Sequence, residues 1–245
     1  MKNEYTIERP ILLSLCDLSG KLSVTGALDL FMDIATLHEE DSGFGVYNML
    51  EKGLYWIVGK TRVHFEECPK MMDEVVIKTW FMKPSRLYVN REYLVTDRDG
   101  KILVTGETEW LVATENCEKL VSVRDYIPET FLYSESGLFG SKMTRLDKDF
   151  SDAELAGRYT VSSVDVDFVG HMNNAAYSRV IMSFLSGEEL RKHPISDAEI
   201  FYSLQCKEGD ELSVYRRNTE GAVEMGAFLP GGTLVMTARL KYGGE

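Results

Sequence analysis

The sequence predicts an α+β protein made of two similar halves, each with one long helix packed on an antiparallel β-sheet. Three observations lead to this prediction. The motif Asp-x-x-Gly occurs at Asp17–Gly20 and again at Asp167–Gly170, each time between a strand-like segment and a helix. Each helix is apolar on one face only, so another layer must cover that face. Strand-like segments that can supply this layer follow each helix.

Apolar residues at three- and four-residue spacing define the two helices. The first is expected from about Val24 to Asp41, with Ser23 or Thr25 as its N-terminal cap. The second is expected from about Asn174 to Ser186, with Asn173 or Asn174 as its N-terminal cap. Both helices therefore begin a few residues after an Asp-x-x-Gly motif.

Alternating or β-branched segments predict the strands of both halves. In the first half they are Tyr55–Phe65, Glu74–Met82, Tyr88–Thr96 and Ile102–Ala113, and in the second half Ala198–Gln205, Glu211–Arg217, Ala222–Phe228 and Leu234–Tyr242. Residues 69–75 also match residues 206–212. One helix wrapped by such a sheet is a hot-dog domain, so we expect a tandem (double) hot-dog. The alternative is a pair of unrelated α+β domains.

The expected domain boundaries follow from this repeat. Residues 1–128 form an N-terminal hot-dog domain, 129–157 a linker rich in Ser, Gly, Asp and Lys, and 158–245 a C-terminal hot-dog domain.

Composition excludes several functional classes. The chain has 27 Lys and Arg against 39 Asp and Glu, a formal net charge of -12, which disfavours binding to nucleic acid. No apolar run reaches the length of a membrane span, and no secretory signal is evident, so we expect a cytoplasmic protein. Its four cysteines lack Cys-x-x-Cys spacing and its four histidines lack His-Glu-x-x-His spacing. We therefore expect reduced thiols, no metal and no cofactor.

The two halves differ where chemistry can arise. Asp167 is followed four residues later by His171, whereas Asp17 is followed by Lys21 at the same distance. A carboxylate can orient an imidazole or a water, and the start of a helix offers backbone N–H groups to a developing oxyanion. This arrangement suits ester or thioester hydrolysis. On spacing alone, the alternative that His171 and Asn173 only cap the helix is equally good.

The segment Val166–Tyr177 resembles the Asp-x-Asn-x-His-Val-Asn-Asn-x-x-Tyr signature of plant and bacterial acyl-acyl-carrier-protein (acyl-ACP) thioesterases. It also resembles the Asp-x-x-Gly-His-Val-Asn-Asn pattern of single-domain acyl-CoA thioesterases. The likeness continues in the first half, through Asp17–Ser23, the helix end at 41–45, Gly53–Val58 and 69–80. The resemblance implies hydrolysis of fatty acyl-ACP thioesters in fatty acid biosynthesis. It further implies an acyl-chain pocket in the N-terminal domain and catalysis in the C-terminal one.

Carried over by position, the resemblance assigns Asp167 and His171 to catalysis, with Asn173 and Gln205 in support. Two positions depart from the family. Its catalytic asparagine falls on Val169, and its glutamate beside a cysteine falls on Gln205, which cannot take up a proton as a carboxylate does. Asp167 is then the carboxylate left to act on water or on the thioester.

The partner implied by the resemblance is acyl carrier protein, which is strongly acidic. The stretch Lys78–Arg91 contains Lys78, Lys83, Arg86 and Arg91 without an acidic residue, so it is a candidate docking patch. A solvated strand face explains the same pattern. A tandem hot-dog already contains two copies of the domain, so a monomer or a homodimer is expected.

Three other functions remain open on the sequence. An acyl-CoA thioesterase would share the fold and the chemistry. A non-catalytic acyl-chain or acyl-ACP binding module is suggested by Val169 and Gln205. A nucleophilic role for Cys206 beside His171 is possible in principle, but free cysteines are usually small buried apolar residues.

The apolar side chains expected to line an acyl tunnel are Phe31, Trp56, Ile57 and Trp80, and plain core packing explains them equally.

Overall fold

The computed structural model describes residues 4–43, 45–114, 119–127, 131–143 and 145–243. The chain divides into two compact units, Met1–Lys142 and Met143–Glu245, and we describe each by itself as the N-terminal and the C-terminal unit. The boundary between them falls within the expected linker 129–157. Residues 129, 130 and 144 of that segment, and Cys117, lie outside the described residues.

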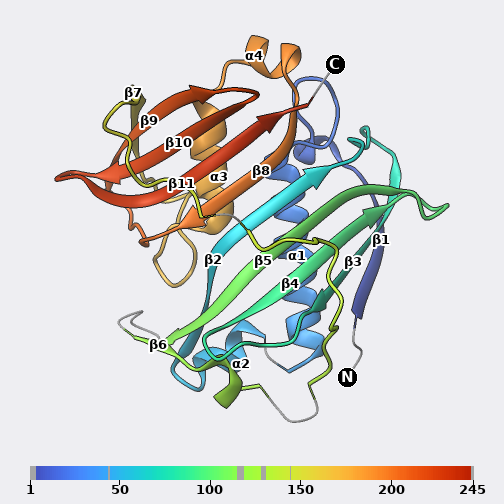
Figure 1. Ribbon diagram of the computed structural model, residues 1–245. Helices are drawn as coiled ribbons and strands as arrows, with labels where there is room; N and C mark the ends of the chain where they lie inside the picture. The colour runs from blue at the N-terminus through green and yellow to red at the C-terminus, as the bar shows by residue number, and fades with distance from the viewer. Residues whose placement is uncertain (1–3, 44, 115–118, 128–130, 144, 244–245) are drawn as a thin grey trace. The chain divides into compact units, whose positions relative to one another are not determined.

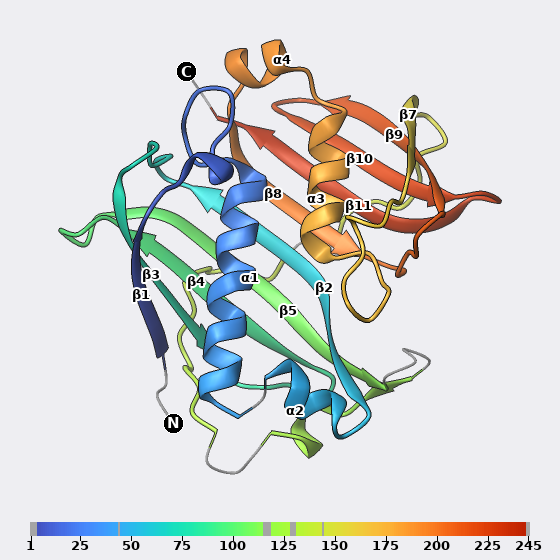
Figure 2. The same ribbon diagram turned by 180° about the vertical axis from the view of Figure 1, so that it is seen from behind.

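The N-terminal unit is one antiparallel sheet with the helix α1 on one face (Figures 1 and 2). The spatial order is β1-β3-β4-β5-β2, and the short β6 pairs with β5. The elements are β1 (Glu4–Pro10), α1 (Val24–Asp41), α2 (Val46–Leu50), β2 (Leu54–Phe65), β3 (Glu74–Phe81), β4 (Tyr88–Thr96), β5 (Ile102–Thr114) and β6 (Leu120–Val121), with single 3₁₀ turns η1 (Leu13–Leu15) and η2 (Val123–Asp125).

The helix α1 confirms the predicted bounds. Ser23 caps it, because its Oγ accepts a hydrogen bond from the N–H of Gly26 at 2.9 Å. The buried side chain of Phe31 stacks on Tyr93 of β4 with 4.4 Å between ring centroids. A Cβ at Gly106 of β5 would lie 2.1 Å from the Phe31 ring, so glycine at 106 lets the helix approach the sheet.

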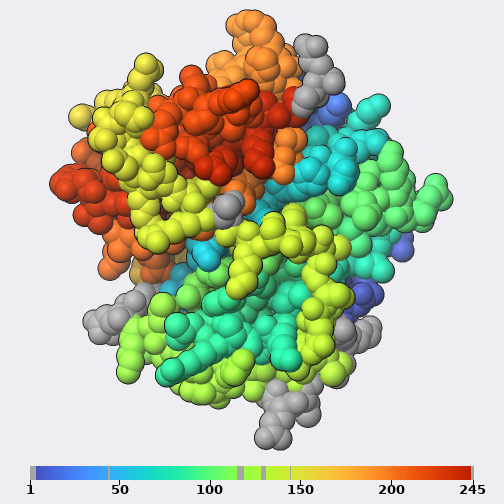
Figure 3. Space-filling view, in the orientation of Figure 1, coloured from blue at the N-terminus to red at the C-terminus, as the bar shows by residue number. Residues whose placement is uncertain are grey.

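The opposite face of this sheet is covered by the chain itself. Residues 134–142, which we call the strap, lie across β4 and β5 (Figure 3). The guanidinium of Arg62 donates to the carbonyl of Ser141 at 2.8 Å and stacks on Phe139, 3.6 Å from its ring centroid. The N–H of Leu138 donates to the carboxylate of Glu92 at 3.0 Å. Two buried polar side chains, Arg62 and Glu92, thus hold the strap.

The C-terminal unit repeats this plan with the sheet order β8-β11-β10-β9-β7 and α3 on one face. Its elements are β7 (Glu154–Thr160), α3 (Asn174–Ser183), α4 (Gly187–Lys192), β8 (Ile195–Tyr202), β9 (Glu211–Thr219), β10 (Ala222–Leu229) and β11 (Thr233–Tyr242). The last four residues of the expected linker, 154–157, therefore lie in β7.

The second helix is shorter than predicted. It ends at Ser183, and a separate helix α4 begins at Gly187. The reason is a cap: the Oγ of Ser186 accepts a hydrogen bond from the N–H of Glu189 at 3.1 Å, so the Ser-x-x-Glu sequence starts a new helix.

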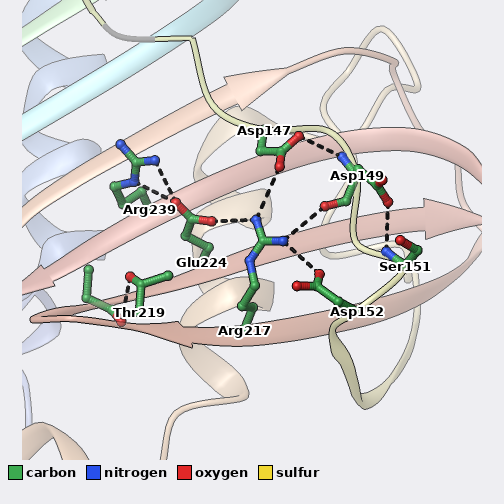
Figure 4. Close-up of polar contacts among 9 residues, drawn as sticks. Asp147, Asp149, Ser151, Asp152, Arg217, Thr219, Glu224 and Arg239 are labelled. Carbon is green, nitrogen blue, oxygen red and sulfur yellow. Dashed lines mark hydrogen bonds and ion pairs between the residues drawn. The ribbon is translucent and has the colours of Figure 1, made fainter.

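The segment that leads into β7 is anchored on the outer face of the C-terminal sheet by Arg217 (Figure 4). Its guanidinium contacts the carboxylates of Glu224 and Asp152, both at 2.7 Å, and Asp147 at 3.6 Å. Arg239 also donates to Glu224, at 2.6 Å. The network satisfies the partly buried carboxylate of Glu224.

The two Asp-x-x-Gly loops have the same backbone hydrogen bonds, which confirms the predicted repeat. The N–H of Asp17 donates to Lys21 O at 2.8 Å, and that of Asp167 donates to His171 O at 2.8 Å. The matching turns 69–73 and 206–210 are likewise tied to the strand before each loop, through Asp73 in one half and Asp210 in the other.

Candidate active site

The carboxylate of Asp167 closes the loop that carries His171. Its Oδ1 accepts hydrogen bonds from the N–H of Val169 at 2.9 Å and from that of His171 at 3.2 Å. Gly170 has a φ of +85°, which a glycine adopts without strain and which turns the chain back toward Asp167. Asp167 therefore fixes the backbone of His171, as Asp17 fixes that of Lys21 in the first loop, where the N–H of Lys21 donates to Asp17 Oδ1 at 3.3 Å. The catalytic pairing of the Asp167 and His171 side chains stays a prediction.

His171 and Asn173 lie at the start of α3. The side chain of His171 is only 9% exposed. Asn173 is the helix cap, because its Oδ1 accepts the N–H of Ala175 at 2.9 Å. The capping alternative thus holds for Asn173. The loop leads directly into the N-terminus of α3. The first N–H groups of this helix and the positive end of its dipole therefore lie next to the loop.

Gln205 lies in the loop after β8, whereas the sequence placed it at the end of a strand. This loop is held against the His171 loop by backbone contacts. The N–H of Met172 donates to Cys206 O at 2.8 Å. The hydroxyl of Tyr177 on α3 accepts the N–H of Cys206 at 2.9 Å and donates to Leu204 O at 3.3 Å. The four predicted site residues therefore lie on two adjoining loops beside α3.

Cys206 does not have the character of a nucleophile. Its side chain is fully buried, and burial raises the pKa of its thiol to about 11. At neutral pH it is a thiol, so its surroundings favour a packing role.

Asp165 is a second carboxylate of this loop, and it lies outside the Asp-x-x-Gly-His motif. It is 6% exposed, and its Oδ2 accepts hydrogen bonds from Tyr159 Oη and Ser162 N at 2.8 Å and from Ser162 Oγ at 2.6 Å. Burial acts to raise its pKa, but these donors hold the pKa below its usual range. The alternation Val-Asp-Val-Asp before Gly170 was the available signal. Asp165 positions the loop, because its carbonyl also accepts the N–H of Asn173.

The basic stretch Lys78–Arg91 is not a continuous surface. Arg91 is completely buried and bonds Glu39 of α1 at 3.0 Å, and Lys78 is half-buried beside Glu4. Only Lys83 and Arg86 are exposed. The predicted docking patch therefore does not include Arg91. Side chains alternate between the two faces of β4, and Arg91 is on the face that α1 covers.

A pocket of about 410 Å³ lies on the outer face of the N-terminal sheet, under the strap. Its lining is about equally polar and apolar, and its polar side chains include Arg62, Asn90, Glu92 and Glu107. None of the side chains expected to line an acyl tunnel lines it. Burial raises the pKa of Glu92 to about 7, against the opposing effects of the Leu138 N–H and Arg62.

Two general features complete the description. Among the described residues, no helix is long and apolar enough to cross a bilayer. In the same part of the chain, no three His, Cys, Asp or Glu side chains gather as a metal site.

The fold and the loops define a double hot-dog protein. Two solved structures share this fold. The 12:0-ACP thioesterase from Umbellularia californica matches with a TM-score of 0.86 at 19% identity, covering 100% of this chain and 99% of that chain. An acyl-ACP thioesterase from Bacteroides thetaiotaomicron matches with a TM-score of 0.84 at 20% identity, covering 98% of each chain.

The sequence families agree with the fold. The acyl-ACP thioesterase N-terminal domain matches residues 2–131, and the acyl-ACP thioesterase C-terminal domain matches residues 149–227. This chain therefore belongs to the acyl-ACP thioesterase family.

The curated relatives are longer than this chain. The chloroplastic palmitoyl-acyl carrier protein thioesterase of Gossypium hirsutum is 27% identical over 198 residues, which cover 76% of this chain and 48% of that protein. The chloroplastic dodecanoyl-[acyl-carrier-protein] hydrolase of Umbellularia californica is 25% identical over 231 residues, which cover 86% of this chain and 60% of that protein. The chain thus spans about half the length of the first of these relatives and somewhat more of the second.

Proposed function

We propose that this protein hydrolyses fatty acyl-ACP thioesters and releases free fatty acid in fatty acid biosynthesis. Its membership of the acyl-ACP thioesterase family supports this activity. The observation that carries the proposal within the chain is the loop in which Asp167 fixes His171 at the start of α3. The same loop in the N-terminal unit, with Lys21 in place of histidine, lacks the imidazole.

In the proposed reaction, water adds to the carbonyl carbon of the thioester and the carbon–sulfur bond breaks. His171 takes the proton from the attacking water and passes it to the departing thiolate. Asp167 supplies the negative charge that stabilises the imidazolium, and Asn173 keeps the start of α3 in place. Gln205 orients the water or the carbonyl by hydrogen bonding, since an amide cannot act as a base at neutral pH. The reaction uses no metal and no cofactor in this scheme.

Asp167→Asn tests the assignment, because an asparagine oxygen can still accept the N–H groups of Val169 and His171 while the charge is lost. We expect the rate of thiol release from acyl-ACP to fall by about 10²–10⁴. The chain offers a matched control, Asp17→Asn, whose Oδ1 closes the other loop through Ser19 N at 2.7 Å. This control should hydrolyse like the wild type. Equal rates for Asp167→Asn and the wild type would show that the role assignment is wrong.

The carrier is decided by comparing kcat/KM for matched acyl-ACP and acyl-CoA. A preference for acyl-ACP supports the proposal, whereas equal or better turnover of acyl-CoA would favour the acyl-CoA alternative. Tight binding of acyl chains without turnover would favour a binding module. The roles expected for the N-terminal unit as the acyl pocket, a cytoplasmic location and a monomer or homodimer remain predictions; the two curated relatives described above are chloroplastic.

A further inference from the structure

The phenol side chain of Tyr177 joins the helix α3 to the loop that carries Gln205. Tyr177 is only 2% exposed. Its hydroxyl accepts a hydrogen bond from Cys206 N at 2.9 Å and donates one to Leu204 O at 3.3 Å. Leu204 and Cys206 are the residues on either side of Gln205. One buried hydroxyl therefore holds the backbone both before and after Gln205.

The hydroxyl is suited to this double contact. Burial raises the pKa of Tyr177 above its usual range, so the group keeps its proton at neutral pH and can donate and accept at the same time. The ring packs edge-on against Tyr202 at the end of β8, with 5.6 Å between ring centroids. Because the ring is attached to α3 and packs on the end of β8, its hydroxyl has a fixed place beside the loop.

The loop of Gln205 is also tied to the loop of His171. Met172 N donates to Cys206 O at 2.8 Å. Met172 follows His171 in the sequence, and Cys206 follows Gln205. The backbone positions of His171 and Gln205 are therefore set by one small group of hydrogen bonds, to which the hydroxyl of Tyr177 belongs.

The first half of the chain builds the same loop by the same backbone hydrogen bonds. The N–H groups of residues 203 and 204 donate to Val235 O at 2.8 and 3.1 Å. The N–H groups of residues 66 and 67 donate to Leu103 O at 3.0 and 3.1 Å. This match aligns the two loops residue by residue, so the two halves can be compared position by position.

The scaffold of this loop does not need the hydroxyl of Tyr177. Cys206 aligns with Pro69, which has no backbone N–H to donate. Tyr177 aligns with Ala27, at the same distance from the helix cap, and alanine offers no hydroxyl. Donor and acceptor are both missing from these positions in the first half, and both are present in the second, where the loop carries Gln205.

We propose that Tyr177 is a positioning residue, which sets the side chain of Gln205 for the reaction by holding the backbone on both sides of it. The proposal rests on the proposed function for the role of Gln205, which orients the water or the thioester carbonyl. Tyr177 acts through Gln205 and takes no proton from the substrate. A hydroxyl that only satisfies the buried N–H of Cys206 is the other explanation, and the two roles differ in what the removal of the hydroxyl changes.

Tyr177→Phe removes the hydroxyl and keeps the ring. We expect kcat for acyl-ACP hydrolysis to fall about tenfold or more while KM stays within about twofold, because the change misplaces a reacting group and leaves substrate binding intact. Tyr242→Phe is the matched control in the same unit, since it removes a hydroxyl that donates to Glu189 at 2.6 Å. This control should keep kcat within about twofold of the wild type. A wild-type kcat in Tyr177→Phe would overturn the proposal.

A double-mutant cycle with Gln205→Ala identifies the path of the effect. If Tyr177 acts through Gln205, Tyr177→Phe should change kcat by less than about twofold once residue 205 is alanine, because the group that it positions is gone. If the two losses multiply, Tyr177 acts independently of Gln205 and the proposal is wrong.

Tyr177→Phe combined with Cys206→Pro separates positioning from simple satisfaction of a buried donor. The first half has proline at this position on a matching backbone, as Pro69. The double variant leaves no N–H at 206 without an acceptor, so its Tm should return toward that of the wild type. We expect kcat to stay about tenfold low or lower. Recovery of kcat together with Tm would mean that the hydroxyl only satisfies the N–H of Cys206.

NMR tests the contact without any turnover. In Tyr177→Phe, the amide of Cys206 should exchange with solvent about tenfold faster or more, and the side-chain amide signals of Gln205 should shift or broaden. Unchanged Gln205 signals would overturn the proposal even if kcat falls. In a chain that hydrolyses no acyl-ACP, the same signals still decide whether Tyr177 holds Gln205, so the proposed function and this proposal fail separately.

Discussion

Single residues of this protein have roles that their neighbours in sequence do not reveal. Arg91 reads as a surface cation in a basic stretch, yet it is fully buried with Glu39 and lies 3.8 Å from the Phe81 ring centroid. Cys206 sits beside the candidate catalytic loop but is a buried thiol with a raised pKa. Met72 has a left-handed backbone, with a φ of +71°, which its counterpart in the second half satisfies with a glycine. Local composition does not predict the burial of Arg91 and Cys206 or the backbone conformation of Met72, because burial and φ depend on the surrounding fold.

Met72→Gly provides a prediction at the residue scale. A left-handed conformation costs a non-glycine residue roughly 1–2 kcal/mol, while glycine loses about 0.5–1 kcal/mol through the extra freedom of the unfolded chain. We therefore expect a net gain in the free energy of unfolding of about 0–1.5 kcal/mol, measured by urea denaturation. Met71→Gly is the matched control, and it should lower the stability by about 0.5–1 kcal/mol. Equal losses from both substitutions would mean that Met72 is not strained.

At the scale of elements, the strap 134–142 behaves as part of the N-terminal sheet. Arg62 and Glu92 hold it through the carbonyl of Ser141 and the N–H of Leu138. A Cβ at Gly137 would lie 2.6 Å from the Glu92 carboxylate, so glycine there allows the strap to approach. The expected linker is thus partly an ordered layer.

The Glu92 contact predicts a pH dependence. Burial raises the pKa of Glu92 from 4.5 to about 7, so the folded state keeps a proton that the unfolded chain releases between these values. The stabilisation from protonated Glu92 is complete below about pH 4.5 and is lost as the pH rises through about 7. Because Gln cannot titrate but can still accept the Leu138 N–H, Glu92→Gln should be free of this loss.

The measurement is the free energy of unfolding of the wild type and of Glu92→Gln from pH 4.5 to 8. We expect the difference between them to change by about 1–2 kcal/mol in this window, with the wild type becoming relatively less stable. The pKa of Glu39 is also raised by burial, but Glu39 is present in both proteins and so cancels. Parallel stability curves would contradict the prediction.

At the scale of the whole molecule, the chain uses one scaffold twice with different side chains. Both halves have the Asp-x-x-Gly loop, the capped helix and the matching turn, which is 69–73 in the first half and 206–210 in the second. The candidate catalytic set lies in the second half, where His171 takes the place of Lys21. At the start of the matching turn, the second half has Gln205 and Cys206, whereas the first half has Cys68 and Pro69 at the same positions. Imidazole alone should therefore not create a second site.

Lys21→His in a His171→Ala background tests this at the scale of the molecule. The first loop would then have an Asp and a His at the same spacing as the second. We expect hydrolysis of acyl-ACP to remain about 10²-fold or more below the wild type, because no counterpart of Asp165 or Gln205 completes the site. Recovery to a rate near that of the wild type would show that the Asp–His pair suffices.

The sequence by itself determined the repeated plan, the start of both helices and the loop that joins Asp167 to His171. These features depend on periodicity, caps and turns that span only a few residues, so they are written locally. The tertiary structure decided that Gln205 lies in a loop pinned by Tyr177, that Arg91 is buried under α1, and that the strap covers a sheet face. Each of these depends on contacts between residues far apart in the chain, and a local pattern carries no information on which partners meet.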